Sequence, residues 1–203
     1  MLSINMSALW GCETDKIVCC VNEATQHILH YKTMSHRPFK MWQSLCQDIC
    51  EVCEFWTGST YVGHQKESAL KDAYQRFFTE LMNMLLWMRN SSLQYESDTA
   101  KELLYQGAVY RYIGSKQPIH DIVEPIYDNI YVSWSKNQHN LYFTSKLYHP
   151  ITWMACNIES PLYGIDLEAM GCSPNNEREV VFPTIEECIT EIKYISEDDD
   201  DET

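Results

Sequence analysis

Two glutamates at the start of an apolar segment are the residues whose types and spacing most clearly suggest chemistry. Glu177 and Glu179 flank Arg178 and precede the run Val180–Pro183. Residues i and i+2 of a strand point to the same face, so we expect the two carboxylates side by side. Residues 164–176, before them, contain Gly, Pro and two Asn, which is typical of a loop. The stretch is either a catalytic loop–strand junction or a solvated strand end with a local charge pattern.

Arg111 is the second candidate, because it is one of only five arginines and lies in an apolar surrounding. In the segment 106–113, apolar or aromatic residues occupy both faces of the expected strand. A charge there costs several kcal/mol unless it has a partner. That partner is either a buried carboxylate or a diphosphate, which a guanidinium binds through two parallel hydrogen bonds.

A third group of residues lies between these two. Ser133 and Ser135 alternate within Tyr131–Asn137, so both hydroxyls are expected on one side of a strand. Tyr142 and Phe143 follow, and they either stack on a flat ring or pack in the core.

The order of these motifs resembles the ADP-ribosyltransferases of the Arg–Ser–Glu class. A strand Arg, an aromatic-x-Ser-x-Ser strand and a Glu-x-Glu pair before an apolar strand follow one another, with Ser133 22 residues after Arg111 and Glu177 44 residues after Ser133. The resemblance covers about residues 104–195, and NEREVVFP is its most specific segment. It is closest to the toxin-like, arginine-modifying members, in which a helical segment often precedes the catalytic sheets.

The resemblance implies a role for each candidate, with NAD as a substrate and no metal. Glu179 would be the catalytic glutamate, and Glu177 would engage an arginine of a protein acceptor. Ser133 would hydrogen-bond Glu179 and hold the nicotinamide ribose, and residues 164–176 would recognise the acceptor. Contacts to NAD would come from Arg111, Tyr112, Ser133, Ser135 and Phe143.

The chain departs from the family pattern at two positions, and three functions remain open. Tyr112 stands where members often have a small residue, and Trp134 stands where Thr is common, which bears on the shape of the nicotinamide pocket. The first function is mono-ADP-ribosyl transfer to a protein arginine. The second is NAD hydrolysis on the same fold, and the third is a non-enzymatic interaction module with structural charges.

The apolar periodicity predicts an α+β fold, with helices in the first half and strands in the second. We expect a single domain, in which residues 1–105 are helical, residues 106–195 form a β-rich catalytic core of two small packed sheets, and residues 196–203 are a disordered acidic tail. The helices are expected at 16–32, 39–55, 66–89 and from Thr99 to near Gly107, with a break at 57–60. The strands are expected at 108–113, 130–134, 149–156, 179–182 and, as an alternative to a helix, 188–195.

Cysteine and histidine patterns do not predict a metal site. Cys46, Cys50 and Cys53 have the spacing of an iron–sulfur loop, but the same spacing describes one face of a helix, which is the interpretation we favour. His27 and His30 are three residues apart, and no third ligand is evident. The nine cysteines indicate a reducing compartment and no disulfide framework.

Composition narrows the partners and the compartment. The net charge is −14, which argues against nucleic acid and anionic membranes because both require cationic patches. No apolar run approaches the about 18 residues of a membrane span, and no signal peptide is evident. We therefore expect a cytoplasmic protein whose partners are NAD and a protein acceptor; secretion without a cleaved signal remains open.

Overall fold

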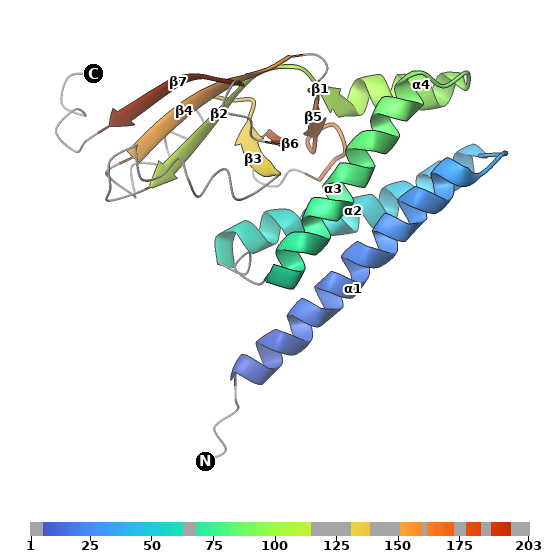
Figure 1. Cartoon of the computed structure of the whole chain (residues 1–203), viewed down its shortest axis with the longest axis horizontal. Helices are drawn as coiled ribbons and strands as arrows, with labels where there is room; N and C mark the ends of the chain where they lie inside the picture. Colours follow the sequence, from blue (N-terminus) through green and yellow to red (C-terminus); the bar gives the residue numbers. More distant parts are fainter. Residues whose placement is uncertain are drawn as a thin grey trace. The chain divides into compact units, whose positions relative to one another are not determined.

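The computed structural model describes residues 6–62, 68–114, 131–138, 151–159, 162–172, 178–183 and 188–195 (Figure 1). In these ranges the protein is α+β, as the sequence predicts, with four helices followed by seven strands. The chain divides into two compact units, Met1–Ser97 and Asp98–Thr203. The predicted acidic tail lies outside the described residues.

The first unit is built from long amphipathic helices. They are α1 (Met6–Thr33), α2 (Phe39–Val62), α3 (Ser68–Arg89) and the start of α4 (Gln94–Leu103). α1 packs against both α2 and α3, because each presents an apolar stripe at helical spacing. The predicted stripe of α3 is buried along its length, from Leu70 to Met88.

Several predicted helix boundaries are wrong. α1 starts at Met6 rather than at residue 16, and α4 ends at Leu103 rather than near Gly107, with Leu104–Tyr105 forming the strand β1. The break at 57–60 does not occur, since α2 continues to Val62; one glycine in a helix costs only about 1 kcal/mol, which is too little to require a break. The last helix starts at Gln94 rather than at Thr99, and its first turn begins at the Leu93 main-chain oxygen, which accepts from the amides of Glu96 and Ser97 at 3.0 and 3.2 Å. Ser91 Oγ accepts a hydrogen bond from the Leu93 amide at 3.2 Å and begins the turn that leads into α4.

The second unit contains one curled antiparallel sheet with the strand order β1-β5-β6-β3-β2-β4-β7. The strands are β1 (Leu104–Tyr105), β2 (Gly107–Gly114), β3 (Val132–Ser135), β4 (Ile151–Ile158), β5 (Gly164–Asp166), β6 (Glu179–Phe182) and β7 (Ile189–Ile195). β2, β4 and β7 form a long ribbon in Figure 1. The predicted strands are thereby confirmed within two residues at each end, and 188–195 is a strand rather than a helix.

The expectation of two small packed sheets is wrong in one respect, since all seven strands belong to one sheet. The join in its middle is nevertheless short. In the described residues, β2 and β3 share a single register pair, Tyr110 opposite Ser135, whereas β2 and β4 share eight. The sheet therefore consists of two halves, β1-β5-β6-β3 and β2-β4-β7, that meet at this one pair, which we call the seam.

β5 was missed, because residues 164–176 have the composition of a loop. Three residues are too short to show strand periodicity, and the strand depends on a contact that sequence does not show. A Cβ at Gly164 would collide with the Val180 side chain on β6, so only glycine lets the two backbones pair here.

A core of apolar side chains supports one face of the sheet across the seam. Alternation places Val180 and Phe182 on this face and Glu179 and Val181 on the other. The buried cluster joins residues of both halves: Val109, Val132, Trp134, Met154, Cys156, Ile158, Val180 and Phe182. Side chains from both halves of the sheet thus pack together in one cluster.

Candidate functional site at the seam of the sheet

Three of the predicted residues are connected at the seam by hydrogen bonds. Arg111 Nη1 on β2 donates to the main-chain oxygen of Ser133 on β3, at 2.7 Å. The Ser133 hydroxyl in turn donates to Glu179 Oε1 on β6. Residues 68 positions apart in the sequence are thus joined through one serine, which uses its backbone towards Arg111 and its side chain towards Glu179.

The local sheet geometry explains why Arg111 reaches this carbonyl. Arg111 is the residue after Tyr110, at the point where the β2–β3 ladder stops. Beyond that point the two strands no longer pair, so no β2 amide donates to the next carbonyl of β3. The Arg111 guanidinium donates to it instead. The Arg111 side chain is half-buried. Because its guanidinium donates to the Ser133 main-chain oxygen, that oxygen does not need a donor from a neighbouring strand.

Glu179 is almost fully buried, with 4% of its surface exposed. It is the first residue of β6 and lies directly opposite Ser135 in the register, one step diagonally from Ser133. Both serines and Glu179 therefore share one face of the sheet, as alternation predicts. The Glu179 main-chain oxygen also accepts from the Leu167 amide at 3.0 Å, which fixes its backbone from the β5 side.

The charges at the seam act on each other. Burial lowers the pKa of Arg111 to about 10, while the negative charge of Glu179 works against that lowering. The guanidinium consequently stays protonated at neutral pH. In the register Arg111 shares the apolar face with Val109 and Met154, whereas Ser133 and Glu179 point to the other face, so the printed contact of the guanidinium with this group is the Ser133 main-chain oxygen. A guanidinium can bind a diphosphate, and a carboxylate oriented by a hydroxyl can stabilise a positively charged reaction centre.

The structure qualifies the argument about the Glu177 and Glu179 pair. β6 begins only at Glu179, and Arg178 has a φ of +50°, in the left-handed region. Strand alternation therefore does not extend across Arg178, so it does not place the two carboxylates on one face. A non-glycine residue in that region costs about 1–2 kcal/mol and occurs where the surroundings enforce it.

The remaining predicted site residues are placed only incompletely. Ser135 Oγ forms hydrogen bonds with Asn137, accepting from its amide at 3.0 Å, on the same face as Ser133. Tyr112 lies on β2 opposite Trp153, and its side chain is outside the portion of the chain that the structure describes. Glu177 and Phe143 also lie outside the described residues, as does the stretch 173–177 before Arg178.

Sequence reasoning missed a set of charged residues beside Glu179. Lys136 Nζ donates to both carboxylate oxygens of Asp166, at 2.7 and 3.0 Å, and also contacts Glu168. Glu168 accepts from Arg178 Nε at 3.2 Å. No spacing signal marks this set, because its members come from three segments that only the sheet brings together; an isolated Lys after the Ser-x-Ser motif is the nearest hint.

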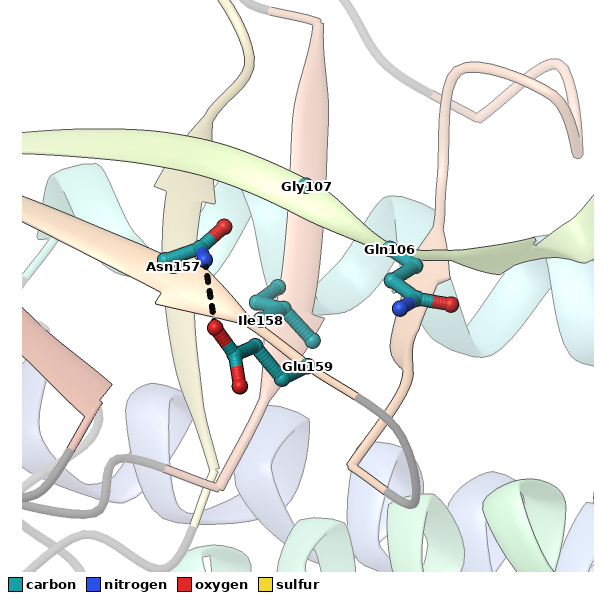
Figure 2. A pocket seen from close by; sticks show the side chains of 5 residues that line it. All are labelled: Gln106, Gly107, Asn157, Ile158 and Glu159. Carbon is teal, nitrogen blue, oxygen red and sulfur yellow. Dashed lines mark hydrogen bonds between the residues drawn. The ribbon is translucent and has the colours of Figure 1, made fainter.

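Two hollows in the described residues lie away from these side chains. One, of about 600 Å³, is lined by Gln106, Gly107, Asn157, Ile158 and Glu159 (Figure 2). In this hollow the side-chain amide of Asn157 donates to the Glu159 carboxylate at 3.0 Å. The other, of about 390 Å³, lies between α1 and α2 and includes His27, which pairs with Asp48 at 2.9 Å. None of the predicted site residues lines either hollow.

The portion of the chain that the structure describes contains no group of three or more His, Cys, Asp or Glu side chains arranged for a metal ion. The iron–sulfur spacing of Cys46, Cys50 and Cys53 lies on the helix α2, with Cys53 in the core. Among the described helices, none is both long and apolar enough to cross a membrane.

Comparison of the chain with protein-family models, curated proteins and solved structures finds no match. The functional argument therefore depends on the residues themselves and on their geometry.

Proposed function

We propose that the protein is an NAD-dependent mono-ADP-ribosyltransferase that modifies arginine on a protein acceptor. One observation carries the proposal: Arg111, Ser133 and Glu179, the three residues singled out from the sequence, are linked by hydrogen bonds in that order at the seam.

The proposed reaction begins with cleavage of the bond between nicotinamide and ribose. The bonding electrons leave with nicotinamide, and positive charge builds on the ribose, as in glycoside cleavage. Glu179 would bind the ribose 2′-hydroxyl and stabilise that charge where it develops. Because Ser133 already donates to Oε1, the carboxylate has a defined orientation before substrate binds.

Arg111 and the acceptor residue complete the mechanism. Arg111 would neutralise the NAD diphosphate, with its position fixed by the Ser133 main-chain oxygen. A guanidinium nitrogen of the acceptor then attacks the ribose C1′, and the proton that it loses passes to Glu177. With water as the attacking group, the same first step gives NAD hydrolysis.

Incubation of the full chain with NAD labelled on the adenylate, with and without a small guanidinium acceptor, tests the proposal. We expect label on the acceptor together with release of nicotinamide. Nicotinamide release without transfer would instead identify a hydrolase on the same residues. Absence of both would overturn the enzymatic proposal and leave an interaction module with structural charges. Glu191→Ala, an exposed acid on β7, is the matched control for changes at Glu179.

The role of Glu177 is tested by separating the two outcomes. Glu177→Gln should reduce transfer to the guanidinium by about 10²-fold or more and leave hydrolysis within a few-fold, because only the acceptor needs this carboxylate. Both rates are measured on the same sample from labelled acceptor and free nicotinamide. Equal losses of the two rates would remove Glu177 from the acceptor site.

A further inference from the structure

An ion-paired cluster crosses β6 immediately beside Glu179. Its members are Lys136, which follows β3, Asp166 at the end of β5, Glu168, and Arg178 before β6. In the sheet order β5-β6-β3, the strand β6 lies between Asp166 and Lys136. The Lys136–Asp166 pair, at 2.7 Å, therefore connects the two neighbours of β6 across that strand.

The cluster is buried where it crosses the strand and exposed at its outer end. The side chains of Lys136 and Asp166 are 10% and 9% exposed, whereas those of Glu168 and Arg178 are 42% and 49% exposed. Partial burial alone would lower the pKa of Lys136, but hydrogen bonds to Asp166 and Glu168 outweigh it and raise the pKa. Lys136 is therefore charged at neutral pH, and its geometry is set by both acids.

The same residues also hold the backbone of the strand start. The Lys136 main-chain amide donates to the Arg178 main-chain oxygen at 3.0 Å. The main-chain amide of Leu167, the residue after Asp166, donates to the Glu179 main-chain oxygen, also at 3.0 Å. Asp166 also accepts from the Ala169 amide at 3.1 Å, which shapes the turn after β5. Two main-chain bonds and one ion pair thus clamp residues 178 and 179 from both sides.

The clamp accounts for the conformation of Arg178. Its left-handed φ of +50° is unfavourable for a side chain other than glycine and needs an external restraint. The main-chain bond from Lys136 and the Arg178–Glu168 pair supply that restraint on the backbone and on the side chain. Because Glu179 is the next residue, the direction of its side chain depends on this restraint.

We propose that Lys136 is a positioning residue for Glu179, acting through the ion pair with Asp166 that holds β6 between its two neighbours. This inference rests on the proposed function only for the statement that Glu179 is catalytic. Lys136 does not touch the substrate in this assignment. Its loss should therefore lower kcat for NAD cleavage and leave KM for NAD nearly unchanged, because Arg111 still binds the diphosphate.

The test compares three variants of the full chain. Lys136→Met removes the charge and keeps the length of the side chain, and Lys136→Arg restores a cation. Lys101→Met is the control, because it removes a lysine from an exposed ion pair with Asp98 in the same unit. Each variant is measured for kcat and KM of nicotinamide release and, independently of activity, for hydrogen exchange at the amides of residues 136 and 167.

We expect Lys136→Met to lose about tenfold or more in kcat, since small misplacement of a catalytic group is costly, and to exchange both amides faster. Lys136→Arg should recover most of both, and Lys101→Met should match the unmodified chain. Unchanged exchange in Lys136→Met, or a loss expressed mainly in KM, would overturn the positioning role. If the unmodified chain releases no nicotinamide, the proposed function fails, while the exchange result still decides whether Lys136 holds the strand start.

Discussion

The most deeply buried carboxylates among the described residues of the two units, Glu96 and Glu179, are held differently. In the helical unit, Glu96 is fully buried and accepts directly from Arg37 Nε at 2.7 Å and from the Tyr31 hydroxyl at 3.0 Å. In the β-rich unit, Glu179 accepts from Ser133, while the nearby Arg111 donates to a main-chain oxygen.

The difference is the one that we expect between a structural carboxylate and one that acts in the proposed reaction. At Glu96 the ion pair and hydrogen bonds from three side chains offset the cost of burying the charge and join the segments that carry them. At the seam, Arg111 is oriented by a main-chain oxygen. Its charge acts on Glu179, but the hydrogen bond to Glu179 Oε1 comes from Ser133. We interpret Glu96 as a lock between helices and Glu179 as a group prepared for a ligand.

The largest expected effect is on turnover. Glu179→Ala should reduce NAD cleavage and transfer by at least about 10³-fold, because the developing charge loses its fixed carboxylate. Nicotinamide release measures the loss, with Glu191→Ala as the control. Turnover within a few-fold of the unmodified chain would remove Glu179 from the catalytic role.

The matching change in the helical unit should act on stability. Glu96→Ala leaves Arg37 nearly buried without its carboxylate and should lower the free energy of unfolding by about 3–5 kcal/mol. Urea unfolding followed by circular dichroism measures it. Glu179→Ala should cost clearly less in the same assay; a larger loss there would reverse the assignment of the two carboxylates.

A third prediction concerns pH. Burial alone would raise the pKa of Glu96, but hydrogen bonds from Arg37, Ser91 and Tyr31 lower it below the ordinary 4.5. A depressed pKa stabilises the fold above the unfolded-state value, and that contribution disappears as the pH falls through the lower, folded-state value.

The stability difference between the unmodified chain and Glu96→Gln should accordingly be constant above about pH 5.5 and shrink as the pH drops below about 4.5. Urea unfolding at a series of pH values measures this difference. A difference that stays constant into the acid range would show that the Glu96 charge contributes nothing to the lock.

The smallest predicted effect isolates the backbone of Arg178. Arg178→Gly and Arg178→Ala both remove the ion pair with Glu168, but only glycine adopts a φ of +50° without strain. The glycine variant should therefore be more stable than the alanine variant by about 1 kcal/mol. Equal unfolding free energies would show that residue 178 relaxes out of the left-handed region once its side chain is removed.

The elements whose apolar periodicity lies in consecutive residues could be predicted from the sequence. The stripe of α3 and the apolar, β-branched run of β6 (Glu179–Phe182) were predicted closely, since their periodicity is written in consecutive residues. β5 was not, because it exists through the contact of Gly164 with β6. α4 was placed too late, because its first turn begins at the Leu93 main-chain oxygen, ahead of the capping-box pattern at residues 99–102.

The site divides in the same way. Arg111, Ser133 and Glu179 could be selected as an unusual charge, an alternating hydroxyl and a carboxylate at a strand start. Lys136, Asp166 and Glu168 could not, because nothing in their spacing shows that β6 lies between β5 and β3. The left-handed Arg178 was equally hidden, since it results from main-chain bonds made by residues far away in the sequence. Catalysis itself stays a prediction.

The contact between Arg111 and Ser133 has a consequence for how such a chain diverges over evolution. Arg111 donates to the main-chain oxygen of residue 133, and every amino acid has this oxygen. A substitution at position 133 therefore leaves the hydrogen-bond acceptor of the guanidinium in place. The contact by itself therefore imposes no covariation between positions 111 and 133, and only a shared role in the proposed site would couple them. Positions 133 and 179, which meet through side chains, should instead covary.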